Sequence, residues 1–174
     1  MRKPVFAAIA LVMMAAVAGA NDHGGGPDRG AGGPGPEGHA IVGSDGTLYL
    51  TSESTSSGTT TVTVKAIRSN GSTAWTATLP AGARRLELSD GNLLTVTSTT
   101  ASDGTIASTL TAISTASGAT AWTKAIAGRI GDLAPFNGGT YVFVTVPSTT
   151  SGGSATHSIV AVDNNGNTLW TVTL

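Results

Sequence analysis

The chain has 174 residues, no cysteine, and only 11% charged residues, with a net charge of −1. The lack of cysteine excludes disulfides and the lipid-acceptor cysteine of a bacterial lipoprotein. The near-neutral charge, with no basic cluster beyond Arg84 and Arg85, makes nucleic acid and anionic membrane poor candidate partners. Low charge with abundant Ser, Thr and Gly is typical of an extracellular β protein and unusual for a helical enzyme.

Residues 1–20 have the pattern of a signal peptide. Two basic residues precede an apolar run of 14 residues, from Val5 to Ala18, and small residues lead to an expected cleavage after Ala20. The run is shorter than the roughly 20 residues that span a bilayer, and no later segment is predicted to be transmembrane. We therefore expect a secreted protein, in the periplasm or at the extracellular cell surface.

Residues 21–38 form a Gly/Pro-rich tract without a large apolar side chain. Such a tract buries too little surface to offset its ordering entropy, which predicts a flexible arm.

Cleavage after Ala20 would place Asn21, Asp22 and His23 at the new amino terminus. The amine, two deprotonated amides and the imidazole of His23 would then offer the square-planar set that Cu(II) or Ni(II) favours. The segment Ala16 to Ala18 offers another cleavage position, and a solvated histidine in a flexible arm is the simpler interpretation.

Residues 39–174 contain three repeats, over about 39–79, 84–127 and 130–174, and their tryptophans recur at intervals of 47 and 48 residues. Repeats of this length are typical of propeller blades or solenoid units. Each tryptophan follows a glycine by four residues. The repeated pairs are Gly71 and Trp75, Gly118 and Trp122, and Gly166 and Trp170.

Each repeat is expected to form four short antiparallel strands with almost no helix. It opens with an Asp-Gly or Asn-Gly turn pair and an apolar strand ("SDGTLYL", "SDGNLLTV", "NGGTYVFV"), and Gly46, Gly91 and Gly139 lie 29, 31 and 31 residues before the respective tryptophans. A Ser/Thr/Gly loop is expected next, then a strand with period-two alternation, and then the strand that carries the tryptophan. In this interpretation the glycine permits the turn, while all three tryptophans pack one sheet on the next.

These repeats resemble those of the pyrroloquinoline-quinone-type β-propellers, which carry "DG", then "T-x-Y-x", then "Y-A-[LI]-[DN]-x-x-T-G-x-x-x-W". The matching segments here are "GSDGTLYL … VKAIRSNGSTAW", "LSDGNLLTV … LTAISTASGATAW" and "NGGTYVFV … IVAVDNNGNTLW". The resemblance implies blade-like sheets, in a family that includes quinoprotein dehydrogenases and non-catalytic scaffolds. Those dehydrogenases use a Ca²⁺ site, an acidic base and usually a vicinal disulfide. A chain without cysteine therefore fits the non-catalytic branch, with no cofactor.

Three blades make an incomplete propeller, because propellers close with about 4–8 blades. We expect Leu174 to leave a bare repeat boundary and the chain to self-associate through exposed faces and edges, as a homo-oligomeric ring or a filament. An extracellular or envelope protein is the other partner class considered. The alternative function is a small-ligand or metal-binding propeller fragment, with Cu(II) at His23 as its sharpest form.

The remaining candidate sites are weak. His39 and His157 are isolated, and "DNNGNT" (163–168) has the oxygen side chains of a Ca²⁺ loop but is interpreted as a turn, because its glycine is misplaced and the bidentate glutamate is missing. Asn70 begins a formal glycosylation sequon. No serine lies in a G-x-S-x-G elbow, so the chain is predicted not to be an enzyme.

Overall fold

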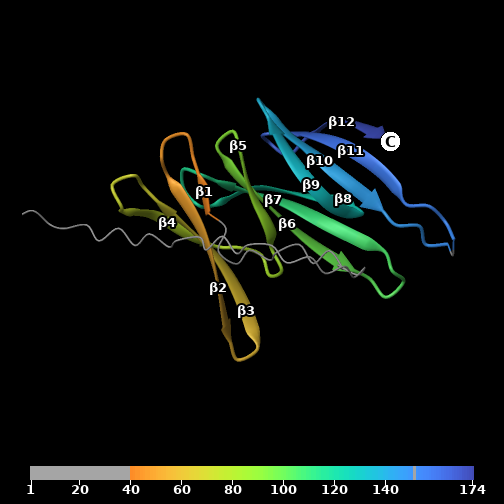
Figure 1. Ribbon diagram of the computed structural model, residues 1–174, viewed down its shortest axis with the longest axis horizontal. Coiled ribbons are helices and arrows are strands. Elements are labelled where there is room, and N and C mark those ends of the chain that lie inside the picture. The colour runs from red at the N-terminus through yellow and green to blue at the C-terminus, as the bar shows by residue number, and fades with distance from the viewer. Residues whose placement is uncertain (1–39, 151) are drawn as a thin grey trace, which may run out of the picture. The chain divides into compact units, whose positions relative to one another are not determined.

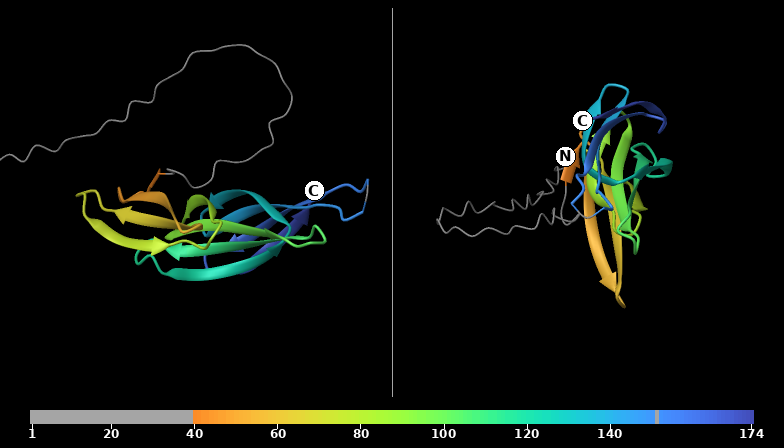
Figure 2. Two further views of the ribbon diagram at one scale, coloured as in Figure 1. Left: turned by 90° about the horizontal axis from the view of Figure 1, so that it is seen from below. Right: turned by 90° about the vertical axis from the view of Figure 1, so that its right-hand side faces the viewer.

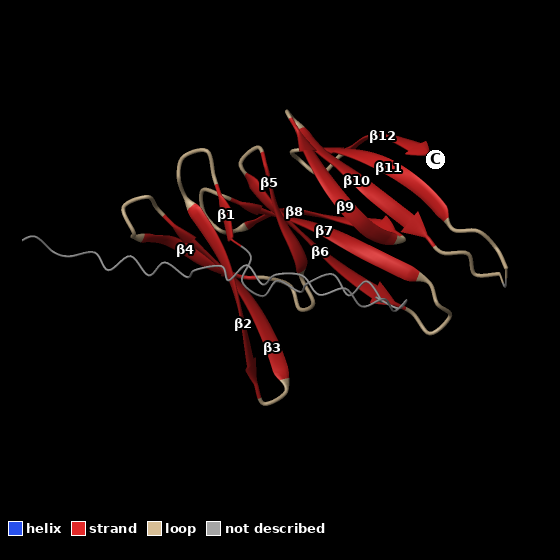
Figure 3. Cartoon of the chain, in the orientation of Figure 1, coloured by secondary structure: helices blue, strands red, loops and turns tan. Residues whose placement is uncertain are grey.

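The computed structural model describes residues 40–150 and 152–174. The expected signal peptide, the arm, His39 and the His23 copper site lie outside the described residues. Every regular element in the described ranges is a strand, as Figure 3 shows. The strands are β1 (Ala40–Val42), β2 (Leu48–Ser56), β3 (Thr59–Ile67), β4 (Thr73–Thr78), β5 (Arg84–Ser89), β6 (Asn92–Thr100), β7 (Ile106–Ser114), β8 (Thr120–Ala127), β9 (Arg129–Phe136), β10 (Gly139–Val146), β11 (Thr156–Asp163) and β12 (Thr168–Thr173). No helix able to cross a membrane occurs in this part of the chain.

The strands form three four-stranded sheets, each a meander of consecutive strands: β1–β4, β5–β8 and β9–β12. All neighbouring strands pair antiparallel. The prediction of an all-β chain built from three four-stranded antiparallel blade-like repeats is confirmed. The sheets follow one another as the colour passes from orange through green to blue (Figure 1).

The hairpin that opens each repeat depends on left-handed backbone. Asp90 and Gly91 have φ 32° and 82°, as a tight type I′ hairpin requires, and Gly46 has φ 79° in the longer connection between β1 and β2. In the third repeat the turn pair is Asn137 and Gly138, as the Asn-Gly pair predicts, and Gly138 has φ 100°. Gly139 begins β10, where an added Cβ would collide with the backbone oxygen of Val162.

The Ser/Thr-rich segments are strand where a loop was expected. In the first repeat, β2 and β3 pair from Leu48 to Ser56, and the hydroxyls of Ser52 and Thr63 lie 2.7 Å apart across the strands. Threonine suits a pleated surface, and cross-strand hydroxyl pairs support it. Only in the third repeat does a long connection remain, between the end of β10 at Val146 and the start of β11 at Thr156.

A β-bulge recurs in the last hairpin of every sheet. The register shifts after Ala66, Ala112 and Ala161, each of which pairs with the tryptophan of its repeat. The extra residue therefore lies directly before the tryptophan. A bulge bends its strand and re-aims a side chain, so the repeated "T-x-W" segment sets the direction of the indole.

Two apolar cores lie between the sheets. The first joins β1–β4 to β5–β8, with fully buried Val64 and Leu93 at its centre. The second joins β5–β8 to β9–β12, with Leu110 and Val142 at its centre. The middle sheet is thus covered on both faces, whereas each outer sheet turns one face away from these two cores.

Candidate interaction surface

The first two sheets are joined by Trp75 on β4. Its Nε1 donates a hydrogen bond of 2.7 Å to the carbonyl of Thr115, in the turn between β7 and β8. Its ring covers Gly118 so closely that a Cβ there would lie 2.6 Å from the ring carbon Cε3. The repeat glycine is therefore needed twice, for its φ of 74° and for the approach of the indole.

The same joint links the second sheet to the third. Trp122 Nε1 donates to the carbonyl of Asn164 at 2.8 Å, and a Cβ on Gly166 would lie 2.9 Å from the ring. Lys124 adds a hydrogen bond of 3.0 Å from its Nζ to the Gly166 carbonyl. Trp75 and Trp122 thus each dock on the turn of the following sheet.

The third sheet presents the same rows of side chains, and no further sheet of the described residues packs over them. Tyr141, Ala161 and Trp170 form one cross-strand row, and Phe143, Ile159 and Val172 form the next. We call the set of Tyr141, Phe143, Ile159, Trp170, Val172 and Leu174 the outer face. In the first two sheets the members of the matching rows on β2, β3, β6 and β7 are buried, and the members on β4 and β8 are half-buried.

Exposure at equivalent positions measures this difference. The backbone N–H of Leu79 bonds the carbonyl of Val62, and that of Leu174 bonds the carbonyl of His157, so the two leucines close equivalent hairpins. Leu79 is 4% exposed, and Leu174 is 74% exposed. The outer face is therefore a surface of core composition that the described residues leave in solvent.

Trp170 is not in the core, which corrects the prediction for all three tryptophans. It is 44% exposed, and its ring centroid lies 5.5 Å from that of Tyr141. Trp75 and Trp122 lie half-buried between sheets, because each has a following turn to cover it. In the first sheet, the glycine that corresponds to Gly118 and Gly166 has no tryptophan over it: nothing lies within 4 Å of a Cβ built on Gly71.

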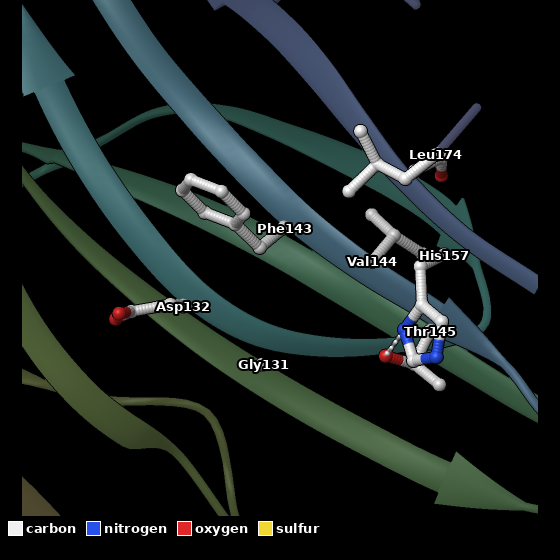
Figure 4. A pocket seen from close by; sticks show the side chains of 8 residues that line it. Gly131, Asp132, Phe143, Val144, Thr145, His157 and Leu174 are labelled. Atoms are coloured by element: carbon white, nitrogen blue, oxygen red, sulfur yellow. Dashed lines mark hydrogen bonds between the residues drawn. The ribbon is translucent and has the colours of Figure 1, made fainter. Parts of the chain in front are cut away.

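A shallow cavity of about 300 Å³ lies on the outer face. Figure 4 shows Phe143 at its centre, with Leu174 and the Thr145 and His157 pair at one end and Asp132 at the other. His157 Nδ1 lies 3.1 Å from Thr145 Oγ1. Asp132 is engaged in an exposed ion pair of 2.7 Å with Arg85. Among the described residues, no cluster of three or more histidine or acidic side chains could hold a metal ion.

The segment 163–168 is a turn, as interpreted from the sequence. Asp163 Oδ1 accepts from the backbone N–H groups of Asn165 and Asn167 at 2.9 and 2.7 Å. Hydrogen bonds from the side chain and backbone of Asn167 hold the pKa of Asp163 below its ordinary value. The acidic oxygens thus shape the turn that receives Trp122.

The pKa of Glu87, on β5 beside its contact with β9, is shifted in the opposite direction to that of Asp163. Burial, together with the charge of Asp132, raises the pKa of Glu87, and the charge of Arg85 partly opposes this. The group lies away from the outer face and belongs to the packing of the second sheet on the third.

The sheets and joints define an all-β repeat protein in which a tryptophan and a glycine link each sheet to the next. No family model matches the chain, and no curated protein matches it. Among solved structures it is similar to the quinohemoprotein alcohol dehydrogenase of Comamonas testosteroni, with 19% identity and a TM-score of 0.42. The similarity covers 80% of this chain and 22% of that one, so the chain spans about a fifth of that enzyme.

The sequence predicted the repeated tryptophans and glycines and an exposed repeat boundary, but the exposure of Trp170 and the apolar side chains around it were not predicted. The signal was present in "TYVFV", where Tyr141 and Phe143 alternate with Val142 and Val144. A strand that is apolar on both sides is expected to be buried on both sides. The acceptor carbonyls of Thr115 and Asn164 had no signal, since any residue supplies a backbone carbonyl.

Proposed function

We propose that this chain is an exported, non-enzymatic structural module that self-associates through the outer face of its third sheet. The observation that carries the proposal is the exposure of Phe143 and Leu174, at 37% and 74%. Their counterparts in the other two sheets are buried: Thr51 and Val96 correspond to Phe143, and Leu79 and Ile126 correspond to Leu174. Leu169, Trp170, Val172 and Leu174 are 53%, 44%, 49% and 74% exposed on β12 and just after it. Contiguous apolar surface of this kind marks interaction sites.

The polar groups around this surface support binding in preference to catalysis. His157 has a threonine hydroxyl as its hydrogen-bond partner, and Asp132 is paired with Arg85. Neither arrangement resembles a nucleophile with its base and orienting group. The sequence likewise contains no nucleophile elbow.

The test is sedimentation velocity on the protein recovered from a bacterial host that expresses the full chain. Association should increase with concentration, and Val172→Asp should abolish it because a charge would then lie within the buried patch. Val146→Asp is the matched control, since Val146 is 41% exposed but aligns with Val142 and Val144, away from the outer face. Equal association of both variants, or a wild-type protein that stays monomeric, would contradict the proposal.

A further inference from the structure

We infer that Trp170 of one copy docks on the Gly71 turn of a second copy and donates its Nε1 hydrogen to the carbonyl of Ser69. The inference rests on the proposed self-association and specifies its geometry. It makes the contact between copies a third instance of the joint that already links the sheets within the chain.

The receiving turn of the first sheet has the same backbone as the turn that receives Trp122. Arg68 N donates to Ser72 O at 2.9 Å and Gly71 N donates to Arg68 O at 2.8 Å. In the third sheet, Asp163 N donates to Asn167 O at 2.9 Å and Gly166 N donates to Asp163 O at 3.1 Å.

The equivalence of the two turns selects the acceptor. Gly71 and Gly166 have φ of 83° and 86°. Ser69 follows the first residue of its turn just as Asn164 does. The Ser69 carbonyl therefore takes the place of the Asn164 carbonyl, which accepts from Trp122.

The Gly71 turn is open where the other two are filled. A Cβ on Gly118 or Gly166 would meet a tryptophan ring at 2.6 or 2.9 Å, whereas a Cβ on Gly71 would meet nothing within 4 Å. Ser69 and Gly71 are both exposed. The first sheet thus presents an unfilled receiving turn, and the third sheet an undocked tryptophan.

The faces around the turn and the tryptophan also match. In the second sheet, Leu93 and Ile113 are 0% and 2% exposed because the first sheet covers them. Their register equivalents in the first sheet are the paired residues Leu48 and Ile67, which are only partly buried. Beside them, Val42 is 64% exposed. An apolar face therefore surrounds each half of the inferred joint.

The two halves lie at opposite ends of the series of sheets, as the views of Figures 1 and 2 agree. Within one copy the second sheet lies between them, because it packs against the first sheet on one face and against the third sheet on the other. Contact between copies is therefore heterologous, and it either closes into a ring or continues as a filament, according to the rotation between copies.

Three alanine variants test the joint. Trp170→Ala removes the docking side chain, and Gly71→Ala places a methyl group where the ring would lie. Gly104→Ala is the control for backbone strain, because Gly104 has φ 82° and nothing within 4 Å of a built Cβ, as at Gly71. We expect the first two to weaken self-association at least about 30-fold, as for an interfacial tryptophan hot spot, and the control to leave it unchanged.

Mixing the two defective variants gives the sharper result. The Trp170→Ala copy retains an open Gly71 turn, and the Gly71→Ala copy retains its Trp170. An equimolar mixture should form one-to-one complexes by native mass spectrometry, although each variant alone stays monomeric. Trp170→Phe keeps the ring but lacks the donor, so it should associate more weakly than wild type and more strongly than Trp170→Ala.

The outcomes separate this inference from the proposed function. If the wild-type protein associates but the mixture forms no complex, the joint is wrong and self-association through another contact stands. If the wild-type protein remains monomeric at every concentration, both fail. If Gly71→Ala does not fold, the graded series of Trp170→Phe and Trp170→Ala still decides, and equal association of both with wild type would overturn the joint.

Discussion

Gly166→Ala perturbs the joint between the second and third sheets through backbone strain and through a collision with the ring of Trp122. Gly166 has φ 86°, and a left-handed conformation costs a residue with a side chain about 1–2 kcal/mol. The added Cβ would also lie 2.9 Å from Cδ2 and Cε3 of Trp122, and such overpacking costs about 1–3 kcal/mol. The free energy of unfolding should therefore fall by about 2–5 kcal/mol.

Gly104→Ala is the matched control in the same chain. Its φ is 82° and its Cβ position is open, so it should cost only the backbone term of about 1–2 kcal/mol. Urea denaturation followed by circular dichroism gives both values. In a Trp122→Ala background, which removes the ring, the excess cost of Gly166→Ala should fall below about 0.5 kcal/mol.

The reasoning is refuted if Gly166→Ala and Gly104→Ala cost the same in the wild-type background. It is refuted equally if the excess cost at position 166 persists without the indole of Trp122, because the collision would then not be with that ring.

Three further predictions follow from the contacts. Trp75→Phe removes the donor to the Thr115 carbonyl and should lower the free energy of unfolding by about 1–2 kcal/mol, measured from the urea midpoint. Hydrogen bonds lower the folded-state pKa of Asp163, so its carboxylate stabilises the fold above its ordinary pKa of 3.8, and this contribution is lost as the pH falls through the folded value. When the pH is lowered below 3.8, the urea midpoint of wild type should therefore fall more than that of Asp163→Asn. The folded-state pKa of Glu87 is raised, so stability is lost as the pH rises from 4.5 through the folded value. Glu87→Gln should therefore have a higher free energy of unfolding than wild type at neutral pH but not in acid. An equal effect of the substitution at both pH values would contradict the raised pKa.

The repeat period predicted the sheets because one strong signal occurs three times. A tryptophan with a glycine four residues before it fixes the last hairpin of each sheet, and the period-two alternation before it fixes the strand that it pairs with. The Ser/Thr segments were misassigned as loops because polar composition was weighed above β-propensity. Their hydroxyls pair across the strands, as those of Ser52 and Thr63 do, so polarity there is compatible with a ladder.

The exposure of Trp170 could not be predicted from its repeat. Its local sequence matches that of Trp75 and Trp122, and its exposure depends on whether another turn covers the ring. That is a property of the neighbouring sheet, in a joint whose acceptor is a backbone carbonyl. The alternation of Tyr141 and Phe143 with two valines was the available indication that the third sheet has two apolar faces.

The central claim is that the outer face of the third sheet associates with another copy. It is tested most directly by the absolute mass of the recovered wild-type protein, measured by light scattering over a concentration series, with negative-stain microscopy of the same sample. We expect a discrete two-copy ring or extended rods built from repeated copies. A monomeric mass at every concentration would contradict it.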